Sequence, residues 1–265
     1  DNLSTKGLIQ VAPNRLFVWN EHHLKDALDI HGLARSRIEV AGAPFFDKWF
    51  EPAETLPGRE EFCRRLGLDP DRRILLYLGS SRKIAANEVW FVQKLGRFLG
   101  ASRNDELRSC QLLVRPHPAN AKIYDDLAKD GVCVFPKGGE LPETREGFTQ
   151  MRASFHHAAA AVGINTSGMV DAVLSGLPTC SVRLPRYADT QSDSVHFRHL
   201  ESGDALYLSD NLTAFCETLI RLFAGEDPKA ENRRAFARKF ARPRGLERSA
   251  GDVIAESVLT LAKRR

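Results

Sequence analysis

The sequence predicts a doubly wound α/β fold, in which a parallel sheet carries helices on both faces. Short apolar runs alternate with longer segments whose apolar residues recur at helical spacing. The runs contain few polar residues, as expected for strands that are buried on both sides. Several runs end in a loop rich in Gly, Ser, Asn, Arg or His. Ligands of such sheets bind beyond the carboxyl ends of the strands, so these loops are the candidate site.

The composition is that of an ordinary globular protein. Of 265 residues, 43% are hydrophobic and 27% are charged, which is enough to build a sizeable core. A net charge of +4 is too small to indicate nucleic-acid binding. The five cysteines form no CxxC pair and are typical of buried thiols in a reducing compartment, which predicts a cytoplasmic location. The chain opens on Asp1, without Met, in a polar run, which is typical of a fragment or of a processed chain.

The chain divides into three parts by pattern. Two strands and one helix at the start make an incomplete layer, so this part is interpreted as the end of a preceding domain. An acidic, Pro-rich stretch, 51–57, suits a linker. The expected parts are 1–57, the end of the preceding domain with its linker; 58–225, the α/β domain; and 226–265, a pair of basic C-terminal helices.

Apolar runs predict the strands. The run Ala158–Ile164 is the clearest, because it is apolar or glycine throughout. The strands expected in the α/β part are Ile74–Leu78, Gln111–Val114, Val132–Phe135, Ala158–Ile164, Thr179–Val182 and Ala205–Leu208. Two further strands, Arg15–Trp19 and Arg37–Val40, precede the linker.

Amphipathic segments predict the helices. Ile84–Leu99 shows an apolar face at helical spacing, and Ser209 is the expected cap of a helix at Leu212–Ala224. Further helices are expected at Asn20–His31, Arg59–Leu66, Lys122–Lys129 and Phe148–His157, and after Gly168. Segments without a predicted helix are Arg103–Arg108, Pro136–Glu146 and the long polar loop Pro185–Ser202.

Two of the strand-end loops carry cations. Gly79-Ser80-Ser81-Arg82-Lys83 offers backbone amides, hydroxyls and charges that suit a diphosphate, although it lacks the spacing of a nucleotide P-loop. Arg115-Pro116-His117-Pro118 is stiffened by its prolines. There Arg115 could pair with phosphate oxygens, and His117 could donate to a phosphate or move a proton. The alternative is a structured turn with a satisfied histidine.

Two further loops carry small polar groups. Asn165-Thr166-Ser167-Gly168 precedes a helix, whose N-terminus could accept a phosphate; alternatively these residues only cap the helix. Asp171 could accept a hydrogen bond from a sugar hydroxyl or simply favour the helix dipole. The long loop adds Gln191 and His196, and His196 is a second candidate for chemistry. Near the start of the chain, Glu21, His22 and His23 are weaker candidates, and the adjacent histidines are unsuited to a joint metal site.

The C-terminal tail is basic. Its last helix carries an apolar stripe at Val253, Ile254, Val258 and Leu261. The tail is either a solvated face or a contact for an anionic membrane surface or acceptor polymer. Its cations are Arg233, Arg234, Arg238, Lys239, Arg242, Arg244 and Arg248.

Four segments resemble a known group of enzymes. In order, RIEVAGAPFFDKW, ILLYLGSSR, LLVRPHP and AVGINTSGMVDAVLSGLPTCSV resemble the two-lobed GT-B glycosyltransferases, especially bacterial surface-polysaccharide enzymes and CDP-glycerol glycerophosphotransferases. The resemblance implies the second lobe of a GT-B-type fold, a Rossmann-like domain that binds a nucleotide-activated donor. It implies that the donor-site residues include Arg115, His117, Thr166, Ser167 and Asp171.

These observations predict a transferase that moves a sugar or polyol phosphate from a nucleotide donor during bacterial surface polysaccharide (capsule) synthesis. A nucleotide-sugar 2-epimerase and a non-catalytic nucleotide-sugar binding module are the alternatives. We expect no metal and no cofactor other than the donor. The expected catalytic residues are His117, Arg115 and His196, and the expected donor-binding residues are Gly79, Ser80, Ser81, Arg82, Asn165, Thr166, Ser167, Gly168, Asp171 and Gln191.

The expected partners follow from the same resemblance. They are a nucleotide sugar or CDP/CMP-type donor and a saccharide or polymer acceptor, with no nucleic acid. The basic tail adds an expected peripheral contact with the inner face of the membrane.

Overall fold

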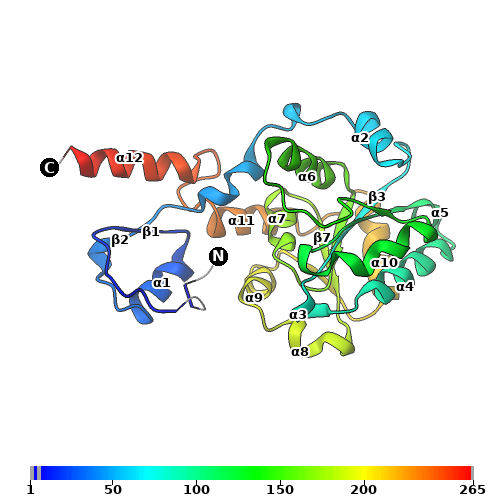
Figure 1. Cartoon of the computed structure of the whole chain (residues 1–265), viewed down its shortest axis with the longest axis horizontal. Helices are drawn as coiled ribbons and strands as arrows, with labels where there is room; N and C mark the ends of the chain where they lie inside the picture. Colours follow the sequence, from blue (N-terminus) through cyan, green and yellow to red (C-terminus); the bar gives the residue numbers. More distant parts are fainter. Residues whose placement is uncertain (1–2, 5–6, 264–265) are drawn as a thin grey trace. The chain divides into compact units, whose positions relative to one another are not determined.

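The computed structural model describes residues 3–4 and 7–263 and consists of two compact units (Figure 1). The larger unit is Pro52–Glu231, and the smaller unit joins Asp1–Glu51 with Asn232–Arg265. Each unit has its own sheet.

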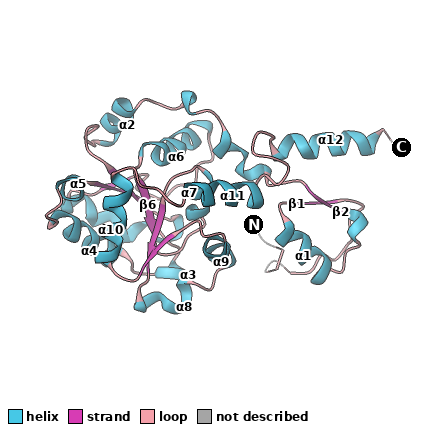
Figure 2. Cartoon of the chain, turned by 180° about the vertical axis from the view of Figure 1, so that it is seen from behind, coloured by secondary structure: helices cyan, strands magenta, loops and turns pink. Residues whose placement is uncertain are grey.

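The larger unit contains a six-stranded, fully parallel sheet in the order β5-β4-β3-β6-β7-β8. This arrangement confirms the predicted doubly wound sheet. In Figure 2 its strands lie at the centre of the unit with helices around them. The strands are β3 (Ile74–Leu78), β4 (Gln111–Arg115), β5 (Cys133–Val134), β6 (Ala160–Gly163), β7 (Thr179–Val182) and β8 (Tyr207–Ser209).

Helices follow most strands of the larger unit. The α-helices are α2 (Arg59–Leu66), α3 (Arg82–Ala85), α4 (Val89–Gly100), α5 (Asp105–Ser109), α6 (Arg145–His157), α7 (Gly168–Leu174), α8 (Ala188–Gln191), α9 (Val195–Ser202) and α10 (Leu212–Phe223). The 3-10 helices are η3 (Ala53–Thr55), η4 (Pro118–Asp130) and η5 (Pro185–Tyr187).

Burial on both faces explains the apolar strands. Every residue of β3 is buried, and Leu75 and Tyr77 pack into one cluster with the apolar faces of α4 and α10. Alternate side chains point to the opposite face, so Arg115, in register with Leu78, points to the face that α6 covers.

Several predicted elements were wrong in detail. The segment Ile84–Leu99 is not one helix, because Glu88 interrupts it between α3 and α4. Arg103–Arg108 contains most of α5, which Asn104 caps by accepting from the backbone N–H of Leu107. The segment Lys122–Lys129 lies within the 3-10 helix η4 rather than an α-helix.

Two corrections concern the end of the larger unit. The long loop Pro185–Ser202 folds into η5, α8 and α9, because its polar side chains bond to the backbone inside the unit. Ser209 ends β8 and does not cap α10. The cap is Asn211, whose side-chain oxygen accepts from Ala214 N at 3.0 Å.

The smaller unit contains two parallel strands. These are β1 (Leu16–Val18) and β2 (Ile38–Val40), with α1 (Glu21–Asp29) between them and the buried side chains of Val18, Leu24 and Ile38 as part of its core. Its other helices are η1 (Arg35–Arg37), η2 (Pro44–Phe50), α12 (Ala250–Ala262) and most of α11 (Ala230–Phe240).

The basic tail is not a uniformly solvated face. Arg233 is 3% exposed and Arg242 is 8% exposed, whereas Arg234, Arg238 and Lys239 lie on the surface of α11. Arg242 pairs with Asp47, whose carboxylate also accepts from Ala250 N at 3.0 Å. This carboxylate joins the η2 segment to the start of α12. The apolar stripe on α12 is buried at Val253 but 49% exposed at Val258.

Breaking the buried pair should destabilise the smaller unit. Asp47→Ala leaves the Arg242 charge buried without its carboxylate, so the free energy of unfolding should fall by about 3 kcal/mol. The exposed pair Arg248–Glu256 is the control, because Glu256→Ala should cost less than about 1 kcal/mol. Urea unfolding followed by Trp fluorescence measures both, since Trp19 and Trp49 belong to this unit. Equal losses from the two variants would contradict the structural role of Asp47.

Candidate functional site

The carboxyl edge of the larger sheet brings most of the predicted site residues together. Hydrogen bonds join the loops directly: Gly79 N donates to Arg115 O at 2.9 Å, and the side-chain Nδ2 of Asn165 donates to Gln191 O at 2.8 Å. Asn165 N also lies 3.5 Å from Ser80 Oγ. The loops after β3, β4, β6 and β7 therefore form one continuous surface.

Gly79 allows two of these loops to approach. A Cβ at Gly79 would lie 2.9 Å from His117 N and 2.9 Å from Tyr124 Oη, which is closer than side chains tolerate. The end of β3 can therefore touch the Arg115–Pro118 turn only because residue 79 has no side chain.

Arg115 is a half-buried cation without a paired carboxylate. Its Nη1 donates to Ser154 Oγ at 3.1 Å, and no carboxylate in the described part of the chain pairs with it. Burial lowers the pKa of Arg115 to about 10, so it stays charged at neutral pH. It lines a cavity of about 390 Å³ whose other charged lining residues are Arg65, Glu140, Glu143 and Glu146. Glu146 is paired with Arg65, so the Arg115 guanidinium, half-buried with a neutral partner, can still accept an anionic ligand.

His117 is held in one tautomer. Its Nδ1 accepts from Ala119 N at 3.1 Å, so the neutral ring carries its proton on Nε2. Burial lowers the pKa of His117, which favours this neutral form. The turn is also backed by Gly139 (φ +67°), where a Cβ would lie 3.1 Å from Pro116 O. The ring can therefore donate a hydrogen bond from Nε2.

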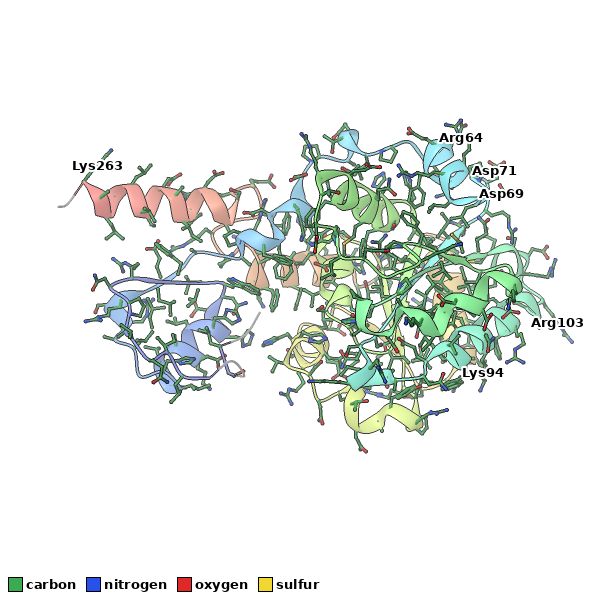
Figure 3. The ribbon with its side chains drawn as sticks, viewed as in Figure 1. Arg64, Asp69, Asp71, Lys94, Arg103 and Lys263 are labelled. Atoms are coloured by element: carbon green, nitrogen blue, oxygen red, sulfur yellow. The ribbon has the colours of Figure 1, made fainter. Side chains whose placement is uncertain are left out.

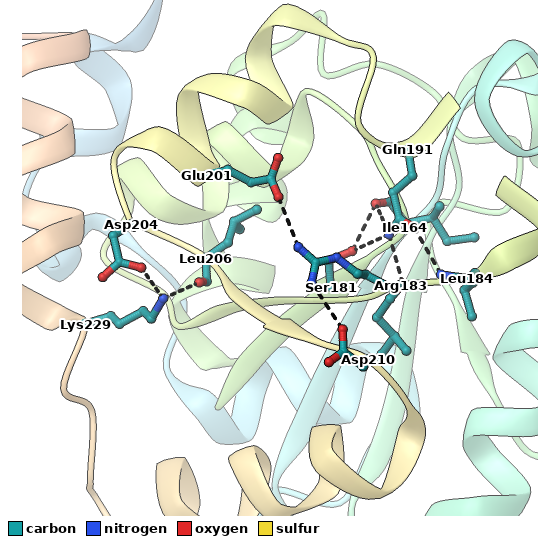
Figure 4. A network of polar contacts seen from close by, with 11 residues as sticks. Ile164, Ser181, Arg183, Leu184, Gln191, Glu201, Asp204, Leu206, Asp210 and Lys229 are labelled. Carbon is teal, nitrogen blue, oxygen red and sulfur yellow. Dashed lines mark hydrogen bonds and ion pairs between the residues drawn. The ribbon is translucent and has the colours of Figure 1, made fainter. Parts of the chain in front are cut away.

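Three predicted donor-binding residues are buried, and their side chains form hydrogen bonds within the protein. Ser80, Asn165 and Gln191 are all buried. Figure 4 shows Gln191 bonded to Ile164, Ser181 and Leu184. Since these side chains hold loops together, their direct contact with a donor stays a prediction.

Other predicted residues remain accessible. Arg82 and Ser167 are exposed, and Ser81, Gly168 and Asp171 are half-buried. Thr166 is nearly buried, and its hydroxyl lies 3.4 Å from Gly168 N at the start of α7.

His196 belongs to a chain of side chains that the sequence did not reveal. Its Nε2 lies 3.3 Å from Ser194 Oγ, which accepts from Asn165 Nδ2 at 2.9 Å. Burial lowers the pKa of His196 to about 4, so the ring is neutral at physiological pH. Ser194 was missed because polar residues in a long loop carry no signal of their direction.

Glu88 was also missed. It is fully buried and accepts from Tyr77, Tyr124 and Ser80. A signal was present, because Glu88 falls on the same helical face as Phe91, Val92 and Leu95 in the predicted helix. A carboxylate on an apolar face needs buried donors.

The weaker candidates belong to the smaller unit. Glu21 and His22 are exposed on α1 of the smaller unit. His23 is buried beside Trp19, with ring centroids 5.0 Å apart, and burial lowers its pKa to about 4. Among the described residues, no group of three or more His, Cys, Asp or Glu side chains could hold a metal ion. No helix in the described ranges is long and apolar enough to cross a membrane.

Solved structures identify the fold. No family model and no curated protein matches this sequence. A putative UDP-N-acetylglucosamine 2-epimerase from Listeria monocytogenes superposes with a TM-score of 0.60 at 15% identity, over 94% of this chain and 60% of that one. The wall teichoic acid polymerase TagF superposes with a TM-score of 0.56 at 15% identity, over 94% and 59%. The chain has a GT-B-type fold.

A third structure agrees. The UDP-GlcNAc 2-epimerase from Methanocaldococcus jannaschii gives a TM-score of 0.58 at 16% identity, over 94% of this chain and 62% of that one. The chain therefore spans about three fifths of the length of the structures it matches. The larger unit is the Rossmann-like lobe of the GT-B-type fold, as predicted.

The lowered pKa of the half-buried His196 gives a pH-dependent prediction for the larger unit. The folded-state pKa of His196 lies below the ordinary 6.5, so the unfolded chain binds the proton more tightly. The free energy of unfolding should therefore fall as the pH is lowered from about 6.5 to about 4, by at most about 1.4 kcal/mol per pH unit from this group. His196→Gln should flatten that slope.

Urea unfolding followed by fluorescence measures this slope in a Trp19→Phe/Trp49→Phe background, where the emission comes from Trp90 of the larger unit. His23→Gln is the matched control, since His23 has a similarly lowered pKa in the smaller unit. An unchanged slope in His196→Gln would contradict the assignment.

Proposed function

We propose that this chain carries the donor-binding lobe of a glycosyltransferase or polyol-phosphate transferase of GT-B type, which acts in bacterial surface polysaccharide synthesis such as capsule formation. The observation that carries the proposal is the Arg115 guanidinium, which is half-buried beside a cavity and is hydrogen-bonded to the neutral Ser154 hydroxyl without a paired carboxylate. An anionic donor would supply the missing negative charge.

The chemistry follows from the leaving group. A nucleoside mono- or diphosphate gains negative charge as its bond to the transferred group breaks. Arg115 supplies a permanent charge, and His117 supplies an N–H donor from Nε2. A preorganised donor of this kind is typically worth about 3 kcal/mol of barrier. Ser81, Arg82 and Ser167 offer further donors, and Asp171 could accept from a sugar hydroxyl.

The comparisons support this proposal at the level of the fold. One TagF structure that superposes on this chain was soaked with CDPG, and another superposed structure is a glycosyltransferase from Rickettsia africae. We infer a nucleotide sugar or a CDP/CMP-type compound as donor and a saccharide or polymer as acceptor. The proposal requires no cofactor besides the donor.

An epimerase is the second candidate. The two epimerase structures superpose with TM-scores of 0.60 and 0.58, which supports this candidate, but less well than the transferase. An epimerase acts on the nucleotide sugar alone, whereas a transferase releases nucleotide only when an acceptor is present. Measuring nucleotide release with and without acceptor separates the two. Donor binding without either reaction would indicate a non-catalytic nucleotide-sugar binding module.

Donor affinity tests the role of Arg115. Calorimetry with a panel of nucleoside diphosphates and nucleotide sugars should show binding that weakens at least tenfold in Arg115→Ala, because a ground-state ion pair is lost. Ser167→Trp should weaken binding by obstruction. Arg103→Ala is the control, since Arg103 projects from the surface of the larger unit (Figure 3). If none of the nucleotides binds the folded protein at millimolar concentration, the proposal is wrong.

Turnover tests the role of His117. In the enzyme assayed with its acceptor, His117→Ala should lower kcat about a hundredfold, with donor affinity less affected, because its hydrogen bond strengthens as charge develops. A melting curve for each variant excludes a merely structural loss. A variant that melts normally and keeps wild-type turnover would remove His117 from the mechanism.

We further propose a location at the inner face of the cytoplasmic membrane. The exposed cations Arg234, Arg238 and Lys239 of α11 support it. The triple alanine variant should lose binding to vesicles that contain anionic phospholipid, because each cation contributes about 1 kcal/mol near such a surface. Replacing Lys94, Arg97 and Arg103 removes the same charge from the larger unit and should leave binding intact. Equal losses would indicate a net-charge effect only.

A further inference from the structure

Glu88 lies beneath the candidate site as a fully buried carboxylate. Its Oε1 accepts from Ser80 N at 2.5 Å and from Tyr124 Oη at 2.6 Å. Its Oε2 accepts from Tyr77 Oη at 2.7 Å and from Ser80 Oγ at 3.0 Å. Each oxygen therefore has two donors, which uses the full capacity of an ionised carboxylate.

Stability alone does not explain this carboxylate. Burial raises the pKa of Glu88, and the bonds from Tyr124, Tyr77 and Ser80 offset part of that rise. No cation among the described residues pairs with it. Burying a carboxyl group costs desolvation free energy that an apolar side chain of similar volume would not cost. We therefore interpret Glu88 as a residue that fixes the geometry of its hydrogen-bond partners and does not maximise the stability of the fold.

The geometry that Glu88 fixes is that of Ser80. Both the backbone N–H and the hydroxyl of Ser80 bond to Glu88. The carbonyl of Ser80 accepts from Asn120 Nδ2 at 3.3 Å, and Asn120 N donates to His117 O at 2.9 Å. The hydroxyl of Ser80 also lies 3.5 Å from Asn165 N. Ser80 thus connects the loops after β3, β4 and β6.

We propose that Glu88 is a positioning residue, which holds Ser80 and through it sets the Gly79–Lys83 loop, the Arg115–Pro118 turn and the Asn165–Gly168 turn in register. Glu88 does not touch the donor. Its effect on donor affinity rests on the proposed function, whereas its effect on the three loops does not.

Three variants separate positioning from packing. Glu88→Met keeps a similar volume but leaves Ser80 N–H without an acceptor. Glu88→Gln can present its carbonyl to Ser80 N–H, while its amide nitrogen meets two hydroxyls, Tyr77 Oη and Ser80 Oγ, that can rotate to accept. Tyr77→Phe removes a hydroxyl from the same core but leaves Ser80 anchored.

Hydrogen exchange of the whole chain, followed by mass spectrometry, tests the positioning itself. Glu88→Met should raise exchange at least tenfold in all three segments, 79–87, 116–121 and 165–168. Glu88→Gln and Tyr77→Phe should stay within threefold of wild type. Changes confined to 79–87, or equal changes in Tyr77→Phe, would overturn the proposal.

Ser80→Ala keeps the proposal testable if Glu88→Met does not fold. Ser80→Ala keeps the backbone bond to Glu88 but deletes the hydroxyl that faces Asn165. It should raise exchange in 165–168 and leave 116–121 unchanged. No change in 165–168 would overturn the connection through Ser80.

Nucleotide affinity tests the consequence for the site. For a nucleoside diphosphate that wild type binds, Glu88→Met should weaken the Kd at least tenfold, Glu88→Gln should restore it, and Tyr77→Phe should leave it within twofold. Wild-type affinity in Glu88→Met would overturn the role in binding. If wild type binds no nucleotide, the proposed function fails and the exchange experiment still decides the role of Glu88.

Discussion

The carboxyl edge of the larger sheet depends on satisfying backbone polar groups away from water. Where β3, β4, β6 and β7 end, the chain turns while still buried, and each exposed N–H or C=O would otherwise lose its hydrogen bond. Glu88, Asn120, Asn165 and Gln191 supply the partners from side chains. Among the described residues, Arg15 Nε in the smaller unit is the only buried side-chain nitrogen or oxygen that lacks a partner. Buried side chains thus fix these loops from the side of the core, and the solvent-facing side of the loops remains free to bind a ligand.

The distinction between buried supporting side chains and solvent-facing side chains explains which parts of the structure the sequence could predict. Strand positions follow from runs that suit burial on both faces, and β3 and β7 were predicted to the residue. The hydroxyls of Thr179 and Ser181 in β7 are tolerated there because they donate to the backbone oxygens of Leu177 and Gly163. The ends of helices depend on single side chains that find buried partners. Glu88 interrupts a helix that periodicity extends from Ile84 to Leu99, because two tyrosines from β3 and η4 meet its carboxylate. No local pattern encodes partners that are 11 and 36 residues away.

The same limit applies to the candidate site. Loop location and composition predicted which loops meet, since parallel strands bring their carboxyl ends to one edge. They could not predict which side chains point inward. Asn165, Gln191 and Ser167 carry similar polar groups, yet the first two are buried in networks and the third is exposed. Direction is decided by packing between elements far apart in the chain, such as α8 against α3 through Thr190 and Ile84.

The tautomer and the neutral form of His117 determine which step of the proposed reaction this residue can assist. Because Nδ1 accepts from Ala119 N, a proton could enter the ring there only by breaking that bond. Burial disfavours the charged ring as well. The residue is therefore suited to donate a hydrogen bond from Nε2 and poorly suited to take a proton from an acceptor hydroxyl. His196 is neutral with its Nε2 directed at Ser194, which places it in the supporting network. In the proposed transferase His117 consequently stabilises the departing phosphate, and neither His117 nor His196 is suited to act as the base that activates the acceptor.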